Sequence, residues 1–257
     1  MLPPEVWAAS WHGRAAEVRQ LLGEGADIED RGWINLSTPL SAASNQGHEA
    51  VVRLLIEQRA EVSAKDDYGN TPLHAAAIGG HGRVARLLLE AGAKVFEKDD
   101  EGATPLHFAT NQEVLRVLVE HGADVSATDT VLMRTPLHWA ANEDVARVLM
   151  EYRADVSAKC TDGTTPLHHA AWRRREAVVR LLLAKGADEQ SKGDDGRTPE
   201  DVATDESHHE IAALLKAEAL RRAQCMAFAM GQHERLGSGS WVQDLDAGVV
   251  RMVLEQV

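Results

Sequence analysis

The sequence predicts an all-α protein built as a solenoid of stacked helix pairs. Three observations predict it: a Thr-Pro pair that recurs at a nearly fixed period, a Leu- and Val-rich segment after each pair, and a low aromatic share. Only 4% of the 257 residues are aromatic although 44% are hydrophobic, so the apolar surface consists mainly of Leu, Val and Ala. Closely packed helices use these side chains, whereas β-sandwiches and barrels are richer in aromatic and β-branched residues.

The repeat period is slightly over thirty residues. Thr-Pro pairs occur at Thr38-Pro39, Thr71-Pro72, Thr104-Pro105, Thr135-Pro136, Thr165-Pro166 and Thr198-Pro199, separated by 33, 33, 31, 30 and 33 residues. Proline fits the first turn of a helix, where its missing amide proton has no helical partner to lose. Each pair therefore predicts the start of a first helix. One unit cannot bury its own apolar face, so neighbouring units must stack.

The second Thr-Pro unit shows how each unit is organised. Pro72 begins the first helix and Gly80 breaks it. Residues 83–91 form a second, amphipathic helix, which Gly92 closes in a left-handed cap. The turn-rich segment 98–102 then predicts a hairpin that leads to the next Thr-Pro pair.

This pattern resembles the ankyrin repeat over about residues 4–220. The residues that carry the resemblance are Thr71-Pro72-Leu73-His74-Ala75-Ala76, Leu87-Leu88-Leu89 and Gly92-Ala93. The resemblance implies an all-α ankyrin-repeat solenoid of stacked helix pairs with short β-hairpin turns, and a C-terminal helical extension follows it. It also implies that the recurring histidines, His74, His107, His138 and His168, form hydrogen bonds to backbone between neighbouring repeats, and that the protein binds other proteins.

Residues 1–224 are expected to form the array, with units starting near 4, 38, 71, 104, 135, 165 and 198. The first unit lacks Thr-Pro but keeps Leu21-Leu22, which fits an amino-terminal cap. The last unit continues as Glu200-Asp201 and loses Leu-His, which fits a carboxy-terminal cap. The fourth and fifth units lack three residues at the junction between their helices. We expect a shorter turn there and a weak point in the stack.

Residues 225–257 are expected to form a helical tail that packs on the array or extends it. Ser207 and Glu210 predict a capping box that opens a long helix. One side of that helix carries Ile211, Leu215, Ala219, Ala223, Met226 and Met230, and a second apolar side follows at Val249, Val250, Val253, Leu254 and Val257. The alternative is a docking box of the kind that links recognition arrays to ubiquitin-ligase scaffolds.

Composition limits the classes of function. The net charge of −13 argues against a protein built to bind nucleic acid phosphates. Cys160 and Cys225 lack the spacing of a disulfide framework or a zinc site, which indicates a reducing compartment. The chain begins without a secretory leader and holds no apolar segment long enough to span a membrane. We therefore expect a soluble, monomeric, cytoplasmic protein, and a nuclear location stays open.

No set of residues predicts catalysis, a metal or a cofactor. The recurring histidines are periodic, whereas a catalytic base needs one unique environment. His208-His209-Glu210 lacks the spacing of a zinc-binding helix, and the Gly-rich segments 23–25 and 237–240 lack the context of a phosphate loop. We expect no enzymatic activity; a regulatory subunit of an enzyme or a weak hydrolase is the alternative.

The remaining candidate is a protein-binding surface. Alignment of the units places a set of residues on the first helices, toward the concave groove, and Arg173 follows in the turn of unit six: Trp11, Asn45, Ile78, Phe108, Asn111, Trp139, Asn142, His169 and Trp172. Phe108 and Trp139 stand where other units have Ala42 or Ala75, so they either bind a partner or pack the seam between units. Aromatic side chains there would be the anchors of an interface.

Charge is concentrated near the carboxy-terminal cap. Residues 188–210 hold nine acidic residues against Lys192 and Arg197. This segment is either a solvated end of the array or a charged docking patch, and the sequence leaves both interpretations open.

Overall fold

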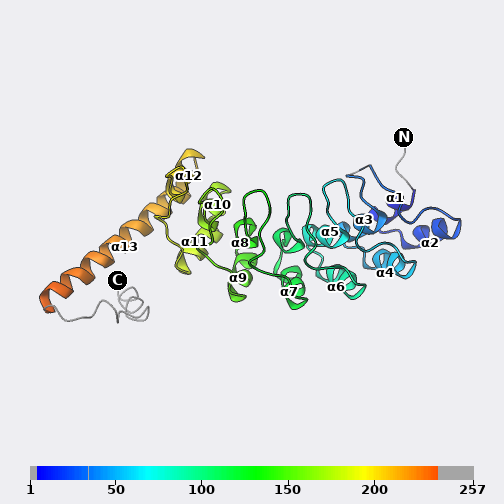
Figure 1. Cartoon of the computed structure of the whole chain (residues 1–257), viewed down its shortest axis with the longest axis horizontal. Coiled ribbons are helices and arrows are strands. Elements are labelled where there is room, and N and C mark those ends of the chain that lie inside the picture. Colours follow the sequence, from blue (N-terminus) through cyan, green and yellow to red (C-terminus); the bar gives the residue numbers. More distant parts are fainter. Residues whose placement is uncertain (1–4, 34, 237–257) are drawn as a thin grey trace.

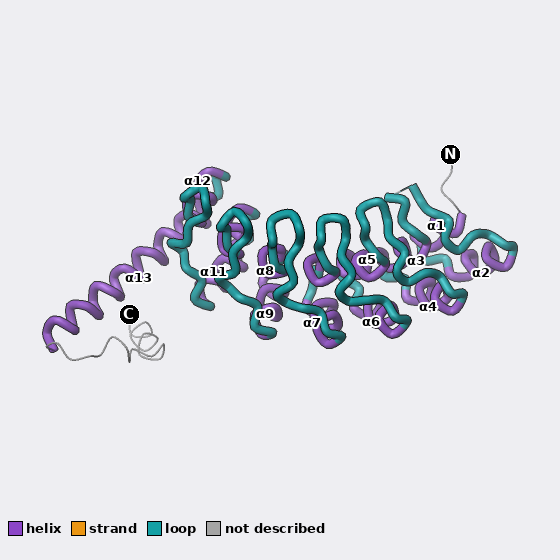
Figure 2. The backbone as a smooth tube through the Cα atoms, in the orientation of Figure 1, coloured by secondary structure: helices purple, strands orange, loops and turns teal. Residues whose placement is uncertain are grey.

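Helix pairs stack in chain order into an elongated solenoid (Figure 1). The computed structural model describes residues 5–33 and 35–236, with side chains as far as residue 228. First helices form one layer and second helices another, and loops run along the free edge of the first layer (Figure 2). The pairs within these ranges are α1 (Glu5–Trp11) with α2 (Ala15–Gly23), α3 (Pro39–Gln46) with α4 (Glu49–Glu57), α5 (Pro72–Gly79) with α6 (Gly82–Glu90), the 3-10 helix η1 (Pro105–Phe108) with α7 (Gln112–Glu120), α8 (Pro136–Trp139) with α9 (Glu143–Glu151), α10 (Pro166–Trp172) with α11 (Glu176–Ala184), and α12 (Pro199–Asp205) with α13 (His209–Leu236).

One continuous core lies between the two layers. The leucine that follows five of the six Thr-Pro pairs is at most 1% exposed, and it packs with leucines of the second helices that are fully buried. The first set is Leu40, Leu73, Leu106, Leu137 and Leu167, and the second is Leu55, Leu88, Leu118, Leu149 and Leu182. The predicted stacking of units that share one apolar seam is confirmed.

The loops between units are hairpin-shaped turns without strands in the described residues. Each loop tip donates one backbone hydrogen bond to the preceding loop, as from Asp100 N to Tyr68 O at 3.0 Å and from Thr130 N to Glu101 O at 2.8 Å. A single bond at each junction is too few for a β-ladder. The expected β-hairpins are therefore wrong as strands, although the turns lie where the sequence placed them.

The recurring histidine caps the start of the first helix in four of the described units and, in three of them, ties that helix to the next unit. Thr71 N donates to Nδ1 of His74 at 3.1 Å, and Nε2 of His74 bonds to Ala103 O of the next loop at 3.2 Å. Because Nδ1 accepts and Nε2 donates, the ring is neutral. His107 and His168 repeat both bonds. The bonding between units that the resemblance implied is present at these three histidines.

His138 departs from this pattern. Thr135 N donates to its Nδ1 at 3.1 Å, but its Nε2 is buried without a hydrogen-bond partner among the described residues. Its ring packs edge-on against His169 instead. Burial lowers the pKa of His138 from 6.5 to about 3 and that of His74 to about 4.

Stability should fall as the pH drops below 6.5. The unfolded chain binds protons at these histidines near pH 6.5, whereas the folded chain binds them only near pH 4 or below. The stabilisation is therefore complete above pH 6.5 and is lost toward pH 4, by about 1 kcal/mol per pH unit for each histidine. Urea unfolding at pH 7.5, 6 and 5 measures it. His74→Gln should reduce the dependence of the unfolding free energy on pH. A urea midpoint that is the same at all three pH values would contradict the prediction.

The two short units have lost a turn of their first helix. η1 and α8 contain four residues each, whereas α3 and α5 contain eight. We expected a shorter turn between the helices, and that expectation is wrong about where the residues are missing. Asn111 and Asn142 have extended backbones and cap the second helices directly, with Oδ1 accepting from Val114 N and Val145 N at 3.0 Å.

We predict faster amide exchange in the short units. In a stacked array, stability is close to a sum of local terms, and a four-residue first helix contributes few of them. Hydrogen exchange followed by mass spectrometry should show faster exchange over residues 104–160 than over residues 71–92. Equal protection of the two regions would contradict the prediction.

The last helix, α13, is one helix of 28 residues that runs beyond the array (Figure 1). Ile211 and Leu215 are 1% exposed, whereas Met226 is 62% exposed. Nη1 of Arg222 lies 2.6 Å from Oε2 of Glu189, a carboxylate that is only 4% exposed. Arg222 also donates to Ala187 O and Leu183 O. The expected apolar stripe thus packs only along its first part.

The start of α13 and the tail differ from expectation or lie outside the structure. Ser207 has φ of 59°, and its N–H donates to Thr204 O, so it ends α12 and the predicted capping box is wrong. The boundary expected at 224/225 falls inside α13, just after Arg222. The side chain of Met230 and the predicted second helix in residues 246–257 lie outside the described residues.

Candidate functional site

The loops and the first helices form one side of the molecule, called the groove here. Two pockets open on it. The N-terminal pocket, of about 210 Å³, is lined by Trp11, Asn35, Ser37, Ser41, Ala42, Asn45, Asp66, Asn70, Thr71, Ala75 and Ile78. The C-terminal pocket, of about 180 Å³, is lined by Asp162, Thr164, His168, His169, Trp172, Arg197, Val202 and Glu206. Phe108 and Trp139 belong to the units between the two pockets.

The N-terminal pocket brings together three of the predicted residues, Trp11, Asn45 and Ile78. The Trp11 ring stacks on Trp7 with centroids 5.4 Å apart, and Nδ2 of Asn45 lies 3.5 Å from Ala75 O. Ile78 is 42% exposed. Contacts within the protein therefore hold Trp11 and Asn45 in place, and Ile78 is the exposed apolar side chain of the pocket.

Phe108 and Trp139 contact each other across the boundary between units four and five. Their ring centroids are 5.2 Å apart with an interplanar angle of 72°, and Phe108 also meets the edge of His74. Both side chains are half-buried. The two interpretations left open by the sequence, seam packing and groove surface, therefore do not exclude each other.

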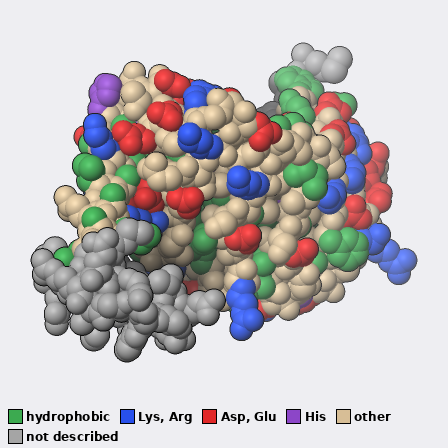
Figure 3. Space-filling view, turned by 60° about the vertical axis from the view of Figure 1, so that its left-hand side comes forward, with side chains coloured by type: hydrophobic (Ala, Val, Ile, Leu, Met, Phe, Trp, Pro, Cys, Tyr) green, Lys and Arg blue, Asp and Glu red, His purple; other side chains and the backbone are tan. Residues whose placement is uncertain are grey.

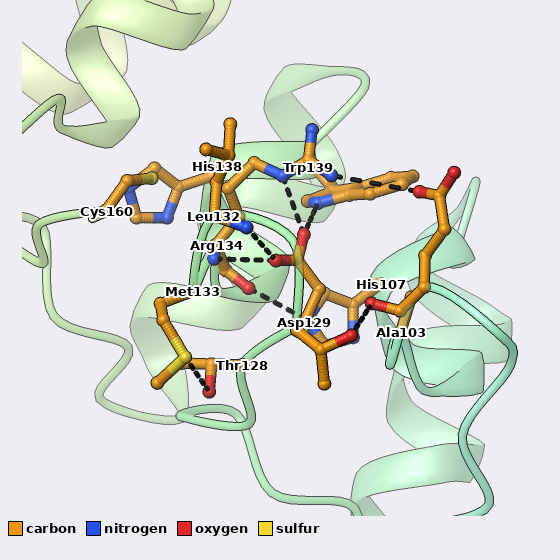
Figure 4. A network of polar contacts seen from close by, with 12 residues as sticks. Ala103, His107, Thr128, Asp129, Leu132, Met133, Arg134, His138, Trp139 and Cys160 are labelled. Atoms are coloured by element: carbon orange, nitrogen blue, oxygen red, sulfur yellow. Dashed lines mark hydrogen bonds and ion pairs between the residues drawn. The ribbon is translucent and has the colours of Figure 1, made fainter. Parts of the chain in front are cut away.

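A polar network holds Trp139 in place (Figure 4). The carboxylate of the fully buried Asp129 accepts from Nε of Arg134 at 2.6 Å and from Nε1 of Trp139 at 3.4 Å. The Arg134 guanidinium lies 4.7 Å from the centre of the Trp139 ring. Burial alone would raise the pKa of Asp129, but the bonds from Leu132 N and Arg134 outweigh it and lower the pKa. Trp139 is thus a fixed part of the groove.

The C-terminal pocket brings together His169 and Trp172, with Arg173 beside them. His169 lies edge-on between His138 at 5.2 Å and Trp172 at 6.5 Å. Trp172 is 45% exposed, and its Nε1 donates to Oε1 of Glu206 at 3.2 Å. The Arg173 guanidinium lies 5.0 Å from the centre of the Trp172 ring. Trp172 is therefore the most accessible tryptophan of the predicted set.

We predicted that Asn111 and Asn142 lie on the first helices. They lie instead at the helix junctions. Besides capping α7 and α9, their Nδ2 groups donate to Gly80 O at 2.8 Å and to Thr110 O at 2.9 Å in the preceding units. Their amide groups are therefore occupied within the array. The prediction was wrong because we placed the three-residue deletion after these positions, at the junction between the helices, whereas the structure shortens the first helix.

One cysteine–histidine pair has the composition of a catalytic dyad but not its protonation. Sγ of Cys160 lies 3.7 Å from Nε2 of His169. Burial raises the pKa of the Cys160 thiol to about 11 and lowers the pKa of His169 to about 4. At neutral pH the thiol stays protonated and the imidazole neutral, which is the reverse of an activated nucleophile. Among the described residues, no group of three or more His, Cys, Asp and Glu could hold a metal ion.

Sequence reasoning missed five residues of the C-terminal pocket: Asp162, Thr164, Arg197, Val202 and Glu206. They come from two loops and the last cap, and no local motif joins them. The signal that could have pointed to them is the excess of acidic residues in segment 188–210, which contains Arg197 and Glu206.

The acidic segment 188–210 is only partly neutralised. Ion pairs join Asp195 and Asp205 to Arg197, Glu189 to Arg222 and Glu210 to Arg174. The other five carboxylates form no ion pair in the described part of the chain. Acidic and basic side chains are interspersed over the face seen in Figure 3, and hydrophobic side chains form small separate patches.

Comparison with known proteins settles the family. Sequence profiles of ankyrin repeats match residues 6–99, 130–192 and 158–223, and a single-repeat profile matches residues 101–130. The chain belongs to the ankyrin-repeat family. Ankyrin repeat domains are generally protein-binding modules and are typically non-catalytic. No helix in the described ranges has the length and hydropathy needed to span a membrane.

Solved ankyrin repeat structures share the fold. The ankyrin repeat domain of Bcl-3, described as a unique member of the IkappaB protein family, is 30% identical, with a TM-score of 0.60 over 77% of this chain and 93% of that one. The human ASB11 ankyrin repeat domain is 27% identical, with a TM-score of 0.71 over 83% of this chain and 96% of that one. No curated protein matches significantly. Because 596 chains of solved structures match, likeness alone identifies no partner.

Proposed function

We propose that this ankyrin-repeat protein is a monomeric cytoplasmic adaptor that binds a protein partner in the groove and at the loop tips. The observation that carries the proposal is the row of aromatic side chains from Phe108 through Trp139 and His169 to Trp172, in three consecutive units of one face. Such side chains are over-represented among the anchors of protein interfaces. The two free cysteines support a reducing compartment.

The loop tips add a second apolar contribution to the same side of the molecule. Trp33, Tyr68, Val131 and Met133 are each 46–59% exposed, and they lie in the first, second and fourth loops between units. A partner seated in the groove would meet these side chains at its rim. The geometry therefore supports a partner that contacts several units at once, as an extended segment or an elongated face does.

Trp172→Ala should weaken partner binding without loss of stability. The side chain is nearly half exposed and its one hydrogen bond, to Glu206, is at the surface, so we expect a loss of about 1–3 kcal/mol, roughly tenfold to a hundredfold in Kd. The partner would be captured by affinity purification with mass spectrometry and titrated by calorimetry. Phe228→Ala removes an exposed aromatic side chain from α13, outside the groove, and is the control. Equal partner affinities of the two variants would contradict the prediction that the partner binds in the groove.

Trp139→Ala should lower both stability and affinity. Its removal leaves the buried Asp129 carboxylate without one donor and takes the ring from beneath Arg134. We expect a loss of about 1–3 kcal/mol in the free energy of unfolding, measured by urea denaturation, in addition to weaker binding. A variant that keeps full stability and loses only affinity would assign Trp139 to the partner alone.

A second candidate function is favoured by the exposed apolar side chains of α13. Leu220, Met226 and Phe228 are 57–62% exposed on a helix that continues past the array. In this alternative, residues 225–257 form a docking element for a second protein, as in a ubiquitin-ligase substrate receptor. We prefer the first candidate, in which the tail packs within the same chain, because Arg222 already anchors α13 to the array.

Deletion of residues 238–257 separates the two. If the tail packs on α13 within the same chain, its deletion uncovers part of α13, lowers the melting temperature and promotes aggregation. If the tail is a docking element, the shortened protein keeps its melting temperature and monomeric state, still binds the groove partner and loses a second partner. We expect the first outcome. Calorimetry, light scattering and affinity purification on the two proteins provide the measurements.

A further inference from the structure

We propose that the C-terminal pocket binds one basic side chain of the partner, with arginine preferred over lysine. This inference rests on the proposed function, because it specifies the chemistry of a single contact within the groove. It draws on the shape of the pocket, on the carboxylates that line it and on a guanidinium that already contacts its tryptophan.

The shape of the pocket fits one long side chain. Its volume of about 180 Å³ is that of about six water molecules at ~30 Å³ each. Trp172, His169 and Val202 form apolar and aromatic walls along it. An apolar wall with acidic groups beside it suits a side chain with an aliphatic stem and a charged end.

Two carboxylates line the pocket without a cation of their own. Oδ1 of Asp162 accepts from Thr164 N at 3.0 Å and from Thr164 Oγ1 at 2.6 Å, and its Oδ2 receives no hydrogen bond from the described residues. Burial would raise the pKa of Asp162, but the bonds from Thr164 outweigh it and lower the pKa, so the carboxylate is charged at neutral pH. Glu206 is exposed, and its carboxylate accepts a hydrogen bond from Nε1 of Trp172. Neither forms an ion pair within the described ranges.

The cation in the pocket wall does not cancel these charges. Arg197 lies 2.6 Å from Asp195 and 3.1 Å from Asp205, so two further carboxylates compensate it. His169 has a pKa of about 4 and is neutral near pH 7, so it does not repel a bound cation. The pocket wall therefore keeps a net negative charge, within a segment that has a strong acidic excess.

The Trp172 ring accepts a guanidinium in the protein itself. Arg173 lies 5.0 Å from its centre, a geometry in which the negative face of the ring attracts a cation. Arg173 forms no ion pair among the described residues, so it can turn away when another guanidinium takes its place. Arginine also matches two separated carboxylates better than lysine does, because its planar group donates in several directions.

The N-terminal pocket gives the contrast that makes the inference specific. Asp66 is the one charged residue in its lining, and the Asp66 carboxylate already accepts from Tyr68 N, Asn70 N and Nδ2 of Asn70. Its lining otherwise consists of Ser, Asn, Ala and other uncharged side chains. A basic side chain would therefore be drawn to the C-terminal pocket and not to the N-terminal one.

Titration with a small probe tests the proposal on the full-length protein. The probe is Nα-acetyl-arginine amide, and its neutral isostere Nα-acetyl-citrulline amide is the matched control. The readout is the indole N–H signal of Trp172 in a proton–nitrogen NMR spectrum, assigned by its absence from Trp172→Phe. We expect the arginine amide to shift this signal with an affinity about fivefold higher than the citrulline amide, and the difference to shrink in high salt.

Variants of the carboxylates complete the test. Asp162→Asn combined with Glu206→Gln should abolish the preference for the arginine amide, while Asp188→Asn combined with Glu200→Gln removes two charges from the same region outside the pocket and should keep it. Circular dichroism melting confirms that both double variants fold. Equal shifts from the two amides, a preference that survives in the pocket variant, or an unshifted Trp172 signal would each overturn the proposal.

The outcome is separable from the proposed function. If a captured partner needs Trp172 but binds the pocket double variant as tightly as the unaltered protein, the basic-side-chain proposal fails and the adaptor function stands. If no partner depends on any groove residue, the adaptor function fails whatever the titration shows. A partner whose binding to the pocket double variant is weakened, and whose own arginine is required, supports both.

Discussion

The stack depends on one kind of hydrogen bond, which recurs at every second helix from α4 onward in the described residues. A side chain at the start of each second helix reaches the carbonyl groups that end the first helix of the preceding unit, groups that helix geometry leaves without a partner. The bonds run from His48 to Trp11 O, His81 to Asn45 O, Asn111 to Gly80 O, Asn142 to Thr110 O, Arg175 to Trp139 O and Ala140 O, and His208 to Ala171 O. Histidine, asparagine and arginine thus make the same kind of bond, and this bond sets how closely neighbouring units lie.

The short units show how much change this arrangement tolerates. With three residues missing, the first helix ends after one turn, yet asparagine takes the place of histidine and the junction bond is kept. Phe108 and Trp139, the bulky groove residues, stand in the two units whose first helix is a single turn. The aromatic row of the groove and the irregularity of the repeat therefore belong to the same part of the chain.

Periodic features could be predicted from the sequence, and single contacts between units could not. The Thr-Pro starts, the buried leucines and the histidines that bond to backbone recur, so each copy supports the others. The role of Asn111 depends on a carbonyl 31 residues away, and the bond of Arg222 to Ala187 O spans 35 residues. Asp162 and Glu206 line one pocket only because two units stack. Each of these contacts depends on a single residue that does not recur, so no sequence pattern indicates it.

The acidic cap also bears on how long such a stack can grow. Each unit presents to the next a face like the one it receives, so an uncovered last unit could accept the first unit of another copy and build a fibre head to tail. At this end the exposed side chains of α12 include Asp201 and Asp205, which a docked copy would have to dehydrate. We therefore expect the acidic side chains, together with the covering helix α13, to oppose the addition of a further unit.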